Sequence, residues 1–136
     1  MVDDGHQAEQ MTNLGRWAAG RAYAPYSGYK VGAVLRGANG KYYTGCNVEN
    51  AAYPQTQCAE ASAIAAMIMD GERSIAEVLV IANSDQIVTP CGGCRQRIRE
   101  FAGPQTPIHC LSQDGAIETH SLEELLPMSF GPEHLE

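Results

Sequence analysis

A continuous apolar run, EVLVIAN at residues 77–83, constrains the fold more than any other segment. A strand with one face in water alternates apolar and polar residues, whereas an unbroken apolar run is typical of a strand covered on both faces. Segments on either side of this run favour helices, at residues 58–69 and from Pro90 to about Phe101. Strands that alternate with helices predict an α/β fold whose sheet carries helices on both faces.

The segment before residue 58 supplies a helix and a hairpin. Residues 7–23 favour a helix with Leu14, Trp17 and Ala18 on one side. Two β-rich runs flank the turn dipeptide Asn39-Gly40 and predict a hairpin, which makes the sheet mixed instead of wholly parallel.

The segment after Phe101 completes the order. PIHCLS, at residues 107–112, predicts a short strand, and the turn at Asp114-Gly115 leaves open a further strand. Ser121 and Glu124 are spaced as a capping box at the start of a short helix. The sequence contains no internal repeat and no low-complexity linker, so we expect a single domain over residues 1–136.

Charge and composition exclude several classes of protein. The net charge of −7 argues against a nucleic-acid partner, because such proteins need a basic surface to neutralise phosphates. The one dense basic group, Arg95, Arg97 and Arg99, is spread round a helix and indicates a solvated face. No apolar run approaches the ~20 residues that span a bilayer, and the polar first residues do not match an export signal. We therefore expect a cytoplasmic protein with a small-molecule substrate.

Three of the five cysteines stand at the starts of expected helices. Cys58 begins one helix, and Cys91 and Cys94 begin another. Residues three apart share one face of a helix, so both sulfur atoms of CGGC can point at one place. Helix N-termini carry partial positive charge and lower thiol pKa values. An odd cysteine count without an export signal also argues against a disulfide framework, so we expect a metal site.

The number of donors separates a structural site from a catalytic one. Structural zinc sites have four protein ligands, whereas catalytic sites have three and a water molecule. No fourth ligand is evident near either motif, although Cys46 could fold back to become one, and Cys110 is expected in the core. The four histidines are distant in sequence and are expected at the surface or in strands: His6, His109, His120 and His134.

Glu60 lies two residues after Cys58 and has two interpretations. A first-turn glutamate complements the helix dipole, worth roughly 0.3–1 kcal/mol. Beside zinc, whose bound water has its pKa lowered from 15.7 to about 7, a glutamate can instead carry protons. The string C-A-E, followed about thirty residues later by P-C-x-x-C, favours the second interpretation, because it is the three-cysteine form of the zinc deaminase motif.

The chain resembles the cytidine deaminases of the small, homotetrameric, three-cysteine class over nearly its whole length. The resemblance runs through YAPYSGYKVGAVL, TGCNVENAAYPQTQCAE, TPCGGCRQRIREF and ELLPMSFGPEHL, in that order. It implies a three-layer α/β/α sandwich with a mixed five-stranded sheet. It also implies zinc-dependent hydrolytic deamination of cytidine and deoxycytidine to uridine and deoxyuridine, with release of ammonia, in pyrimidine salvage.

The resemblance assigns roles residue by residue. It implies one Zn²⁺ per subunit on Cys58, Cys91 and Cys94, with Glu60 as the proton carrier. The expected substrate contacts are Asn47 and Glu49 to the ribose, Tyr29 beside the base, the backbones of Ala51 and Ala59, and Phe130 in a neighbouring subunit's site of a homotetramer.

Ala61 departs from the family pattern, which commonly has arginine directly after the C-A-E glutamate. Three thiolates on Zn²⁺ leave a formal charge of −1, which such an arginine would offset. We hypothesise that Arg95, or the two helix dipoles, partly compensate.

Three alternatives remain open from the sequence. The first is a deaminase of another aminated nucleoside or heterocycle, for which the same four metal-site residues would serve. The second is a non-catalytic structural zinc module with Cys46 as fourth ligand. The third is a C-x-x-C redox protein, which leaves the Cys58-Ala59-Glu60 unit without a role.

Overall fold

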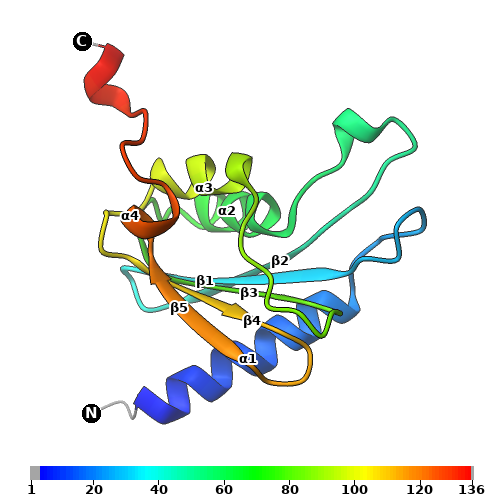
Figure 1. Cartoon of the computed structure of the whole chain (residues 1–136). Coiled ribbons are helices and arrows are strands. Elements are labelled where there is room, and N and C mark those ends of the chain that lie inside the picture. The colour runs from blue at the N-terminus through cyan, green and yellow to red at the C-terminus, as the bar shows by residue number, and fades with distance from the viewer. Residues whose placement is uncertain (1–3, 136) are drawn as a thin grey trace.

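The computed structural model describes residues 4–135, which form three layers (Figure 1). The elements are, in chain order, α1 (Asp4–Gly20), β1 (Val31–Gly37), β2 (Tyr42–Cys46), α2 (Ala59–Met69), β3 (Ile75–Ala82), α3 (Gly92–Arg99), β4 (Pro107–Leu111), β5 (Ile117–Ser121) and α4 (Leu122–Leu125), with short 3₁₀ turns at Tyr53–Gln55 and Pro132–Leu135.

The sheet has five strands in the order β2-β1-β3-β4-β5. Strands β3 and β4 are parallel, and the other neighbouring pairs are antiparallel. Helix α1 covers one face of the sheet, and α2 and α3 cover the other (Figure 1). The predicted α/β/α sandwich with a mixed five-stranded sheet is therefore confirmed, and β5 is the further strand that the sequence left open.

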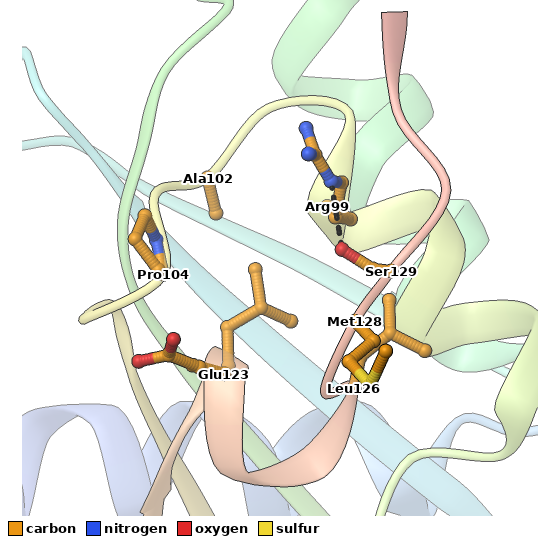
Figure 2. Close-up of a pocket in the computed structure, with 8 residues that line it drawn as sticks. Arg99, Ala102, Pro104, Glu123, Leu126, Met128 and Ser129 are labelled. Carbon is orange, nitrogen blue, oxygen red and sulfur yellow. Dashed lines mark hydrogen bonds between the residues drawn. The ribbon is translucent and has the colours of Figure 1, made fainter. Parts of the chain in front are cut away.

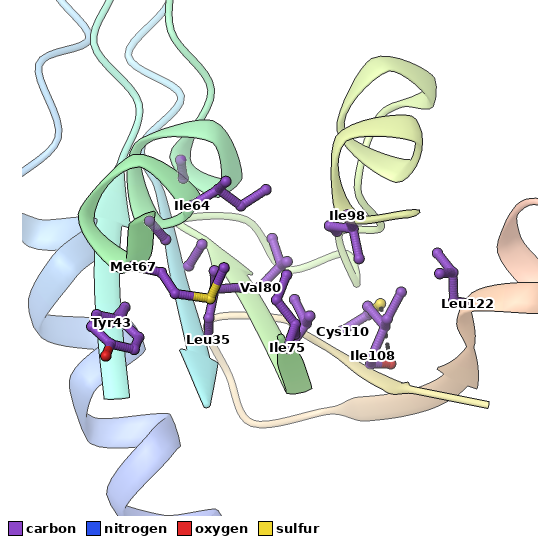
Figure 3. Close-up of a cluster of buried hydrophobic side chains, with 14 residues drawn as sticks. Leu35, Tyr43, Ile64, Met67, Ile75, Val80, Ile98, Ile108, Cys110 and Leu122 are labelled. Carbon is purple, nitrogen blue, oxygen red and sulfur yellow. Dashed lines mark hydrogen bonds between the residues drawn. The ribbon is translucent and has the colours of Figure 1, made fainter. Parts of the chain in front are cut away.

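Strand β3 is buried on both faces, as its apolar run predicts. Val78 and Val80 face α2 and α3, in the cluster of buried side chains that Figure 3 shows. Leu79 and Ile81 face α1, where they pack with Met11. Full burial of a side chain of this size stabilises the fold by about 1.5–3 kcal/mol.

Two glycines allow the helices to lie directly against the sheet. A Cβ atom on Gly32 would lie 2.3 Å from the carbonyl oxygen of Gly15 in α1. A Cβ atom on Gly45 would lie 2.4 Å from the carbonyl oxygen of Ala59 and 2.4 Å from the amide nitrogen of Ala63, both in α2. Gly45 therefore sets how closely the N-terminus of α2 approaches the sheet.

The structure corrects the predicted bounds of α1 and the predicted place of Trp17. The helix ends at Gly20, before the predicted end, because the backbone of Tyr23 pairs with that of Asn47 and Glu49. Trp17 is 56% exposed, and the Arg21 guanidinium lies 5.4 Å from its ring centroid. The prediction that Trp17 shares a packed side with Leu14 and Ala18 is wrong.

The later elements follow the sequence more closely. Gly40 and Gly71 have φ values of 83° and 89°, as the predicted turn and helix end require. The capping box at Ser121 is present, since its hydroxyl accepts a hydrogen bond from the Glu124 amide. Pro90 lies one residue before the N-cap of α3 and not in its first turn, which corrects that boundary. No helix within residues 4–135 is long and apolar enough to cross a membrane.

Candidate metal centre and active site

Three cysteines meet where α2 and α3 begin. Cys58 is the N-cap residue of α2, Cys91 is the N-cap residue of α3, and Cys94 is buried in the first turn of α3. Neither N-cap sulfur accepts a hydrogen bond from its own helix. The three Sγ atoms lie within 4.8 Å of one another. The predicted grouping of these cysteines is therefore present in the fold.

The electrostatics of this group fit a bound cation. Burial raises the pKa of Cys58, and burial together with the charges of Glu60 and the other two sulfurs raises the pKa of Cys94 strongly. Burial acts in the same direction on Cys91, but hydrogen bonds from Cys94 and Cys58 outweigh it and lower the pKa of Cys91. Three such thiolates are stable together only with a compensating positive charge, and Zn²⁺ prefers this sulfur donor set.

No fourth histidine, cysteine or carboxylate joins this group within residues 4–135. Cys46 lies at the end of β2, outside the group. Cys110 is buried in β4, where burial raises the pKa of its thiol to about 11 and makes it a core residue, as expected. A closed four-ligand structural site would need one of these donors, so the arrangement fits a catalytic centre better.

Glu60 lies in the first turn of α2 with 4% of its surface exposed. Burial raises its pKa, and its own backbone amide and the charge of Arg97 act in the opposite direction. Glu60 lines the same pocket as Cys58 and Cys91. A buried carboxylate with a raised pKa, beside a group of metal donors, is suited to holding and passing a proton.

The pocket beside the cysteines has a volume of about 220 Å³. It brings together six residues predicted from the sequence: Tyr29, Asn47, Cys58, Ala59, Glu60 and Cys91. It adds five others: Val31, Thr56, Val80, Val88 and Thr89. The one available sequence signal for these five is that Val88 and Thr89 directly precede the P-C-x-x-C motif, since the others come into the wall only through the fold.

Asn47 holds part of the pocket wall in place. Its Nδ2 donates to the Tyr29 carbonyl oxygen at 2.8 Å, and its Oδ1 accepts from the Val31 amide at 2.8 Å. The side chain is 9% exposed. Both ends of the amide therefore fix the segment that carries Tyr29, and the predicted contact of Asn47 with ribose stays a prediction.

Glu49 lies in an adjoining cavity of about 390 Å³, which shares Thr56 with the first pocket. Its carboxylate accepts hydrogen bonds from the amides of Tyr26 and Ser27, at 2.9 and 3.1 Å, and from the Ser27 hydroxyl. The bond from that hydroxyl is the main cause that lowers the pKa of Glu49. Glu49 is therefore an ionised acceptor next to the pocket, as a contact to a sugar hydroxyl would require.

Two predicted site residues lie outside both cavities. Ala51 is exposed in the irregular segment before α2. Phe130 is 54% exposed on the C-terminal segment that projects from the body in Figure 1, and its ring stacks on His134 with centroids 5.2 Å apart. One chain does not bring Phe130 to its own pocket, so its place in a neighbouring site stays a prediction.

The arginines of α3 do not form the solvated face that the sequence indicated. Arg95 donates to the carbonyl oxygens of Pro90 and Leu125, each at 2.7 Å. Arg97 donates to the Cys94 sulfur at 3.6 Å, and Arg99 donates to the Ser129 hydroxyl at 3.1 Å. The hypothesis that Arg95 offsets the thiolate charge is therefore wrong, because the arginine at the sulfur is Arg97.

Another cavity, of about 250 Å³, lies beside the C-terminal segment (Figure 2). Arg99 and Ser129 form part of its wall and are joined by the hydrogen bond drawn there. It contains none of the predicted site residues, so the chemistry concentrates at the cysteine pocket.

Comparison with known proteins gives a consistent family. Residues 6–110 match the family model described as the cytidine and deoxycytidylate deaminase zinc-binding region. The chain is 40% identical over 127 residues to a cytidine deaminase of Sporosarcina psychrophila, covering 93% of each chain. It is 40% identical over 111 residues to a cytidine deaminase of Mycoplasma genitalium, covering 81% of this chain and 85% of that one.

Solved structures agree with the sequence comparison. A crystal structure of cytidine deaminase from Burkholderia pseudomallei has a TM-score of 0.86 and 35% identity, and covers 90% of this chain and 98% of that one. A cytidine deaminase structure from Mycobacterium tuberculosis has a TM-score of 0.81 and 32% identity, covering 96% and 99%. The chain belongs to the zinc-binding cytidine and deoxycytidylate deaminase family.

Proposed function

We propose that this chain is a zinc-dependent hydrolase that converts cytidine to uridine and deoxycytidine to deoxyuridine, with water consumed and ammonia released. The observation that carries the proposal is the meeting of three cysteine sulfurs within 4.8 Å, in a pocket that also holds buried Glu60. Membership of the deaminase family and the names of the relatives support the choice of substrate.

The chain's own groups divide the work. Cys58, Cys91 and Cys94 hold Zn²⁺, which when bound makes hydroxide available near neutral pH. Glu60 takes up a proton, delivers it to ring nitrogen N3 so that the neighbouring carbon is more easily attacked, and passes a proton to the departing amine. Burial favours the protonated form of Glu60, which assists the delivery steps.

Substrate orientation is assigned to the pocket wall and its neighbour. Tyr29 flanks the base, the backbones of Ala51 and Ala59 contact it, and Asn47 and Glu49 bind the ribose hydroxyls. The positions of Asn47 in the wall and of Glu49 in the adjoining cavity support these roles.

The remaining proposals concern the setting of the reaction. We propose a homotetramer in which Phe130 completes a neighbouring subunit's site. We also propose a cytoplasmic role in pyrimidine salvage, with no nucleic-acid or membrane partner. The exposed position of Phe130 on a projecting segment supports the shared site.

Glu60→Gln tests the proposed function. The variant keeps the size of the side chain but cannot carry a proton, so we expect it to bind one zinc per subunit and to lose at least about 10²–10⁴-fold in turnover. Zinc is measured by elemental analysis, and turnover by the absorbance loss of cytidine. Glu9→Gln, an exposed position on α1, is the control and should match wild type. Full activity in Glu60→Gln would exclude the proton-carrying role.

A substrate panel addresses the alternative of another aminated heterocycle. If Asn47 and Glu49 bind ribose, cytidine and deoxycytidine should both be turned over with far higher kcat/KM than free cytosine. Equal kcat/KM for cytosine and cytidine would remove the proposed sugar contacts, and activity on other aminopyrimidines alone would favour the alternative substrate.

A further inference from the structure

Arg97 lies one turn after Cys94 on α3, on the side of the helix that faces the cysteine group. Its Nη1 donates a hydrogen bond to the Cys94 sulfur at 3.6 Å, within the usual range for a sulfur acceptor. Cys94 is fully buried, so this charged donor acts where solvent screening is weak. Within residues 4–135, Arg97 forms no salt bridge with a carboxylate that would hold it elsewhere.

Small residues around the guanidinium make this contact possible. A Cβ atom on Gly93 would lie 3.3 Å from Arg97 Nη1, so the side chain folds back over the space that glycine leaves. Arg97 and Ala61 line the same groove between α2 and α3. The first turn of α2 brings no cation there, because Ala61 follows Glu60. The guanidinium therefore enters from α3.

We propose that Arg97 is a positioning residue that sets the charge of the metal centre by holding the Cys94 thiolate in a charge-assisted hydrogen bond. Three thiolates and one Zn²⁺ carry a net charge of −1, and a guanidinium donor brings the assembly to zero. The hydrogen bond withdraws electron density from the sulfur, which weakens its donation to the metal and preserves the metal's Lewis acidity. Neither Arg95 nor Arg99 can replace it, since their donors bind other oxygens.

The link to turnover rests on the proposed function, but the link to the sulfur does not. The primary readout is therefore the sulfur-to-cobalt charge-transfer band of protein in which Co²⁺ replaces zinc. Removing the hydrogen bond makes the thiolate more electron-rich, so Arg97→Met should move this band to longer wavelength. Arg97→Lys keeps the charge and should move it less. Arg21→Met removes a charge from the far end of α1 and should leave it unchanged.

The second readout is the rate with cytidine as a function of pH. Loss of a residue that supports a metal ligand typically lowers activity about 10–100-fold. We expect Arg97→Met to show a loss of this size at pH 7, with the acidic limb of its pH profile displaced to higher pH. A residue with a purely structural role would lower activity without displacing the profile.

The outcomes separate the two proposals. A displaced band with no turnover of cytidine by wild type would support the role of Arg97 and contradict the proposed function. An unchanged band in Arg97→Met would overturn the role of Arg97, whatever the activity. If Arg97→Met does not take up cobalt, Arg97→Lys decides. Uptake with a band near that of wild type supports the role of the charge, and loss of uptake in both variants contradicts it.

Discussion

At the scale of single residues, the centre is a problem of negative charge. Three buried sulfurs and a buried glutamate lie within one small region, and burial disfavours the ionised form of Cys58, Glu60 and Cys94. The structure provides two helix N-termini and the guanidinium of Arg97 against that charge. Balance among these groups, and not any one of them, makes the site workable.

Ala61→Arg gives a prediction at this scale. Ala61 and Arg97 line one groove, so an arginine at position 61 reaches the same sulfurs from α2. In the wild-type background Ala61→Arg should change kcat for cytidine by less than about threefold, because the charge is already offset. In the Arg97→Met background it should recover most of the lost rate. A double variant no faster than Arg97→Met would show that charge in this groove does not matter.

The sequence identified the four central site residues and misplaced one arginine. Cys58, Cys91 and Cys94 could be found because their spacing is fixed by the first turns of two helices, and Glu60 because it is tied to Cys58 by sequence. The direction of an arginine side chain has no such local rule. It depends on gaps left by distant neighbours, so the spacing of α3 could not place Arg97 at a sulfur.

At the scale of elements, the position of the site depends on how closely α2 lies on the sheet. Gly45 of β2 faces the backbone of Ala59 and Ala63, and any side chain there must push α2 away. Because α2 begins at Cys58, such a shift moves one donor of the metal centre relative to the two on α3.

Gly45→Ala should therefore affect stability and metal binding together. We expect a loss of about 1–3 kcal/mol in the free energy of unfolding, as for other overpacked cores, with weaker zinc binding. Urea unfolding and a chelator competition measure the two effects. Gly103→Ala, where a Cβ meets nothing within 4 Å, is the control and should be neutral or slightly stabilising. Normal zinc affinity in a destabilised Gly45→Ala would separate the packing from the site.

A polar network on the α1 face of the sheet gives a prediction about pH. Glu77 of β3 accepts a hydrogen bond from Arg36 of β1 at 3.0 Å and lies 2.5 Å from the Nε2 of His109 in β4. The His109 contact, followed by Arg36, lowers the pKa of Glu77 below its usual 4.5. A carboxylate with a lowered pKa stabilises the fold above its unfolded pKa, and this contribution is lost as pH falls through the folded value.

Glu77→Gln should consequently unfold more easily than wild type at pH 7, by roughly 1–3 kcal/mol. The difference should shrink as the pH falls below 4.5, because wild type then loses the same interactions. Urea denaturation at several pH values measures this, with Glu9→Gln as the control. A difference that stays constant from pH 7 to the acid limit would show that ionisation of Glu77 is not its source.

Element types were more predictable than element ends. The apolar run of β3, the turn glycines and the capping box at Ser121 are local signals, and the structure confirms them. The end of α1 depends instead on backbone pairing between Tyr23 and the segment after β2, and that pairing involves residues more than twenty positions away. No local pattern records it.

At the scale of the whole molecule, the predicted site is incomplete in one chain. The pocket gathers Tyr29, Asn47 and the metal residues, but Phe130 lies on the projecting C-terminal segment (Figure 1). Its ring is exposed although it is large and apolar, as expected of a residue that packs against another subunit.

Mixing two inactive variants tests the shared site. Phe130→Ala should lower activity strongly, and Glu60→Gln should abolish it, when each is present alone. After the two are unfolded and reassembled together, some sites combine Glu60 from one chain with Phe130 from its neighbour, so activity should return. Wild type diluted with Glu60→Gln controls for reassembly. No recovery in the mixture would indicate that each chain uses its own Phe130 or none.

X-ray absorption at the zinc edge of the purified, zinc-loaded protein tests the central claim most directly. The account predicts one zinc per chain, bound to three sulfur atoms at about 2.3 Å and one oxygen at about 2.0–2.2 Å. Four sulfur atoms would mean that Cys46 or Cys110 closes the shell, which would contradict a hydrolytic centre and return the protein to a structural zinc module.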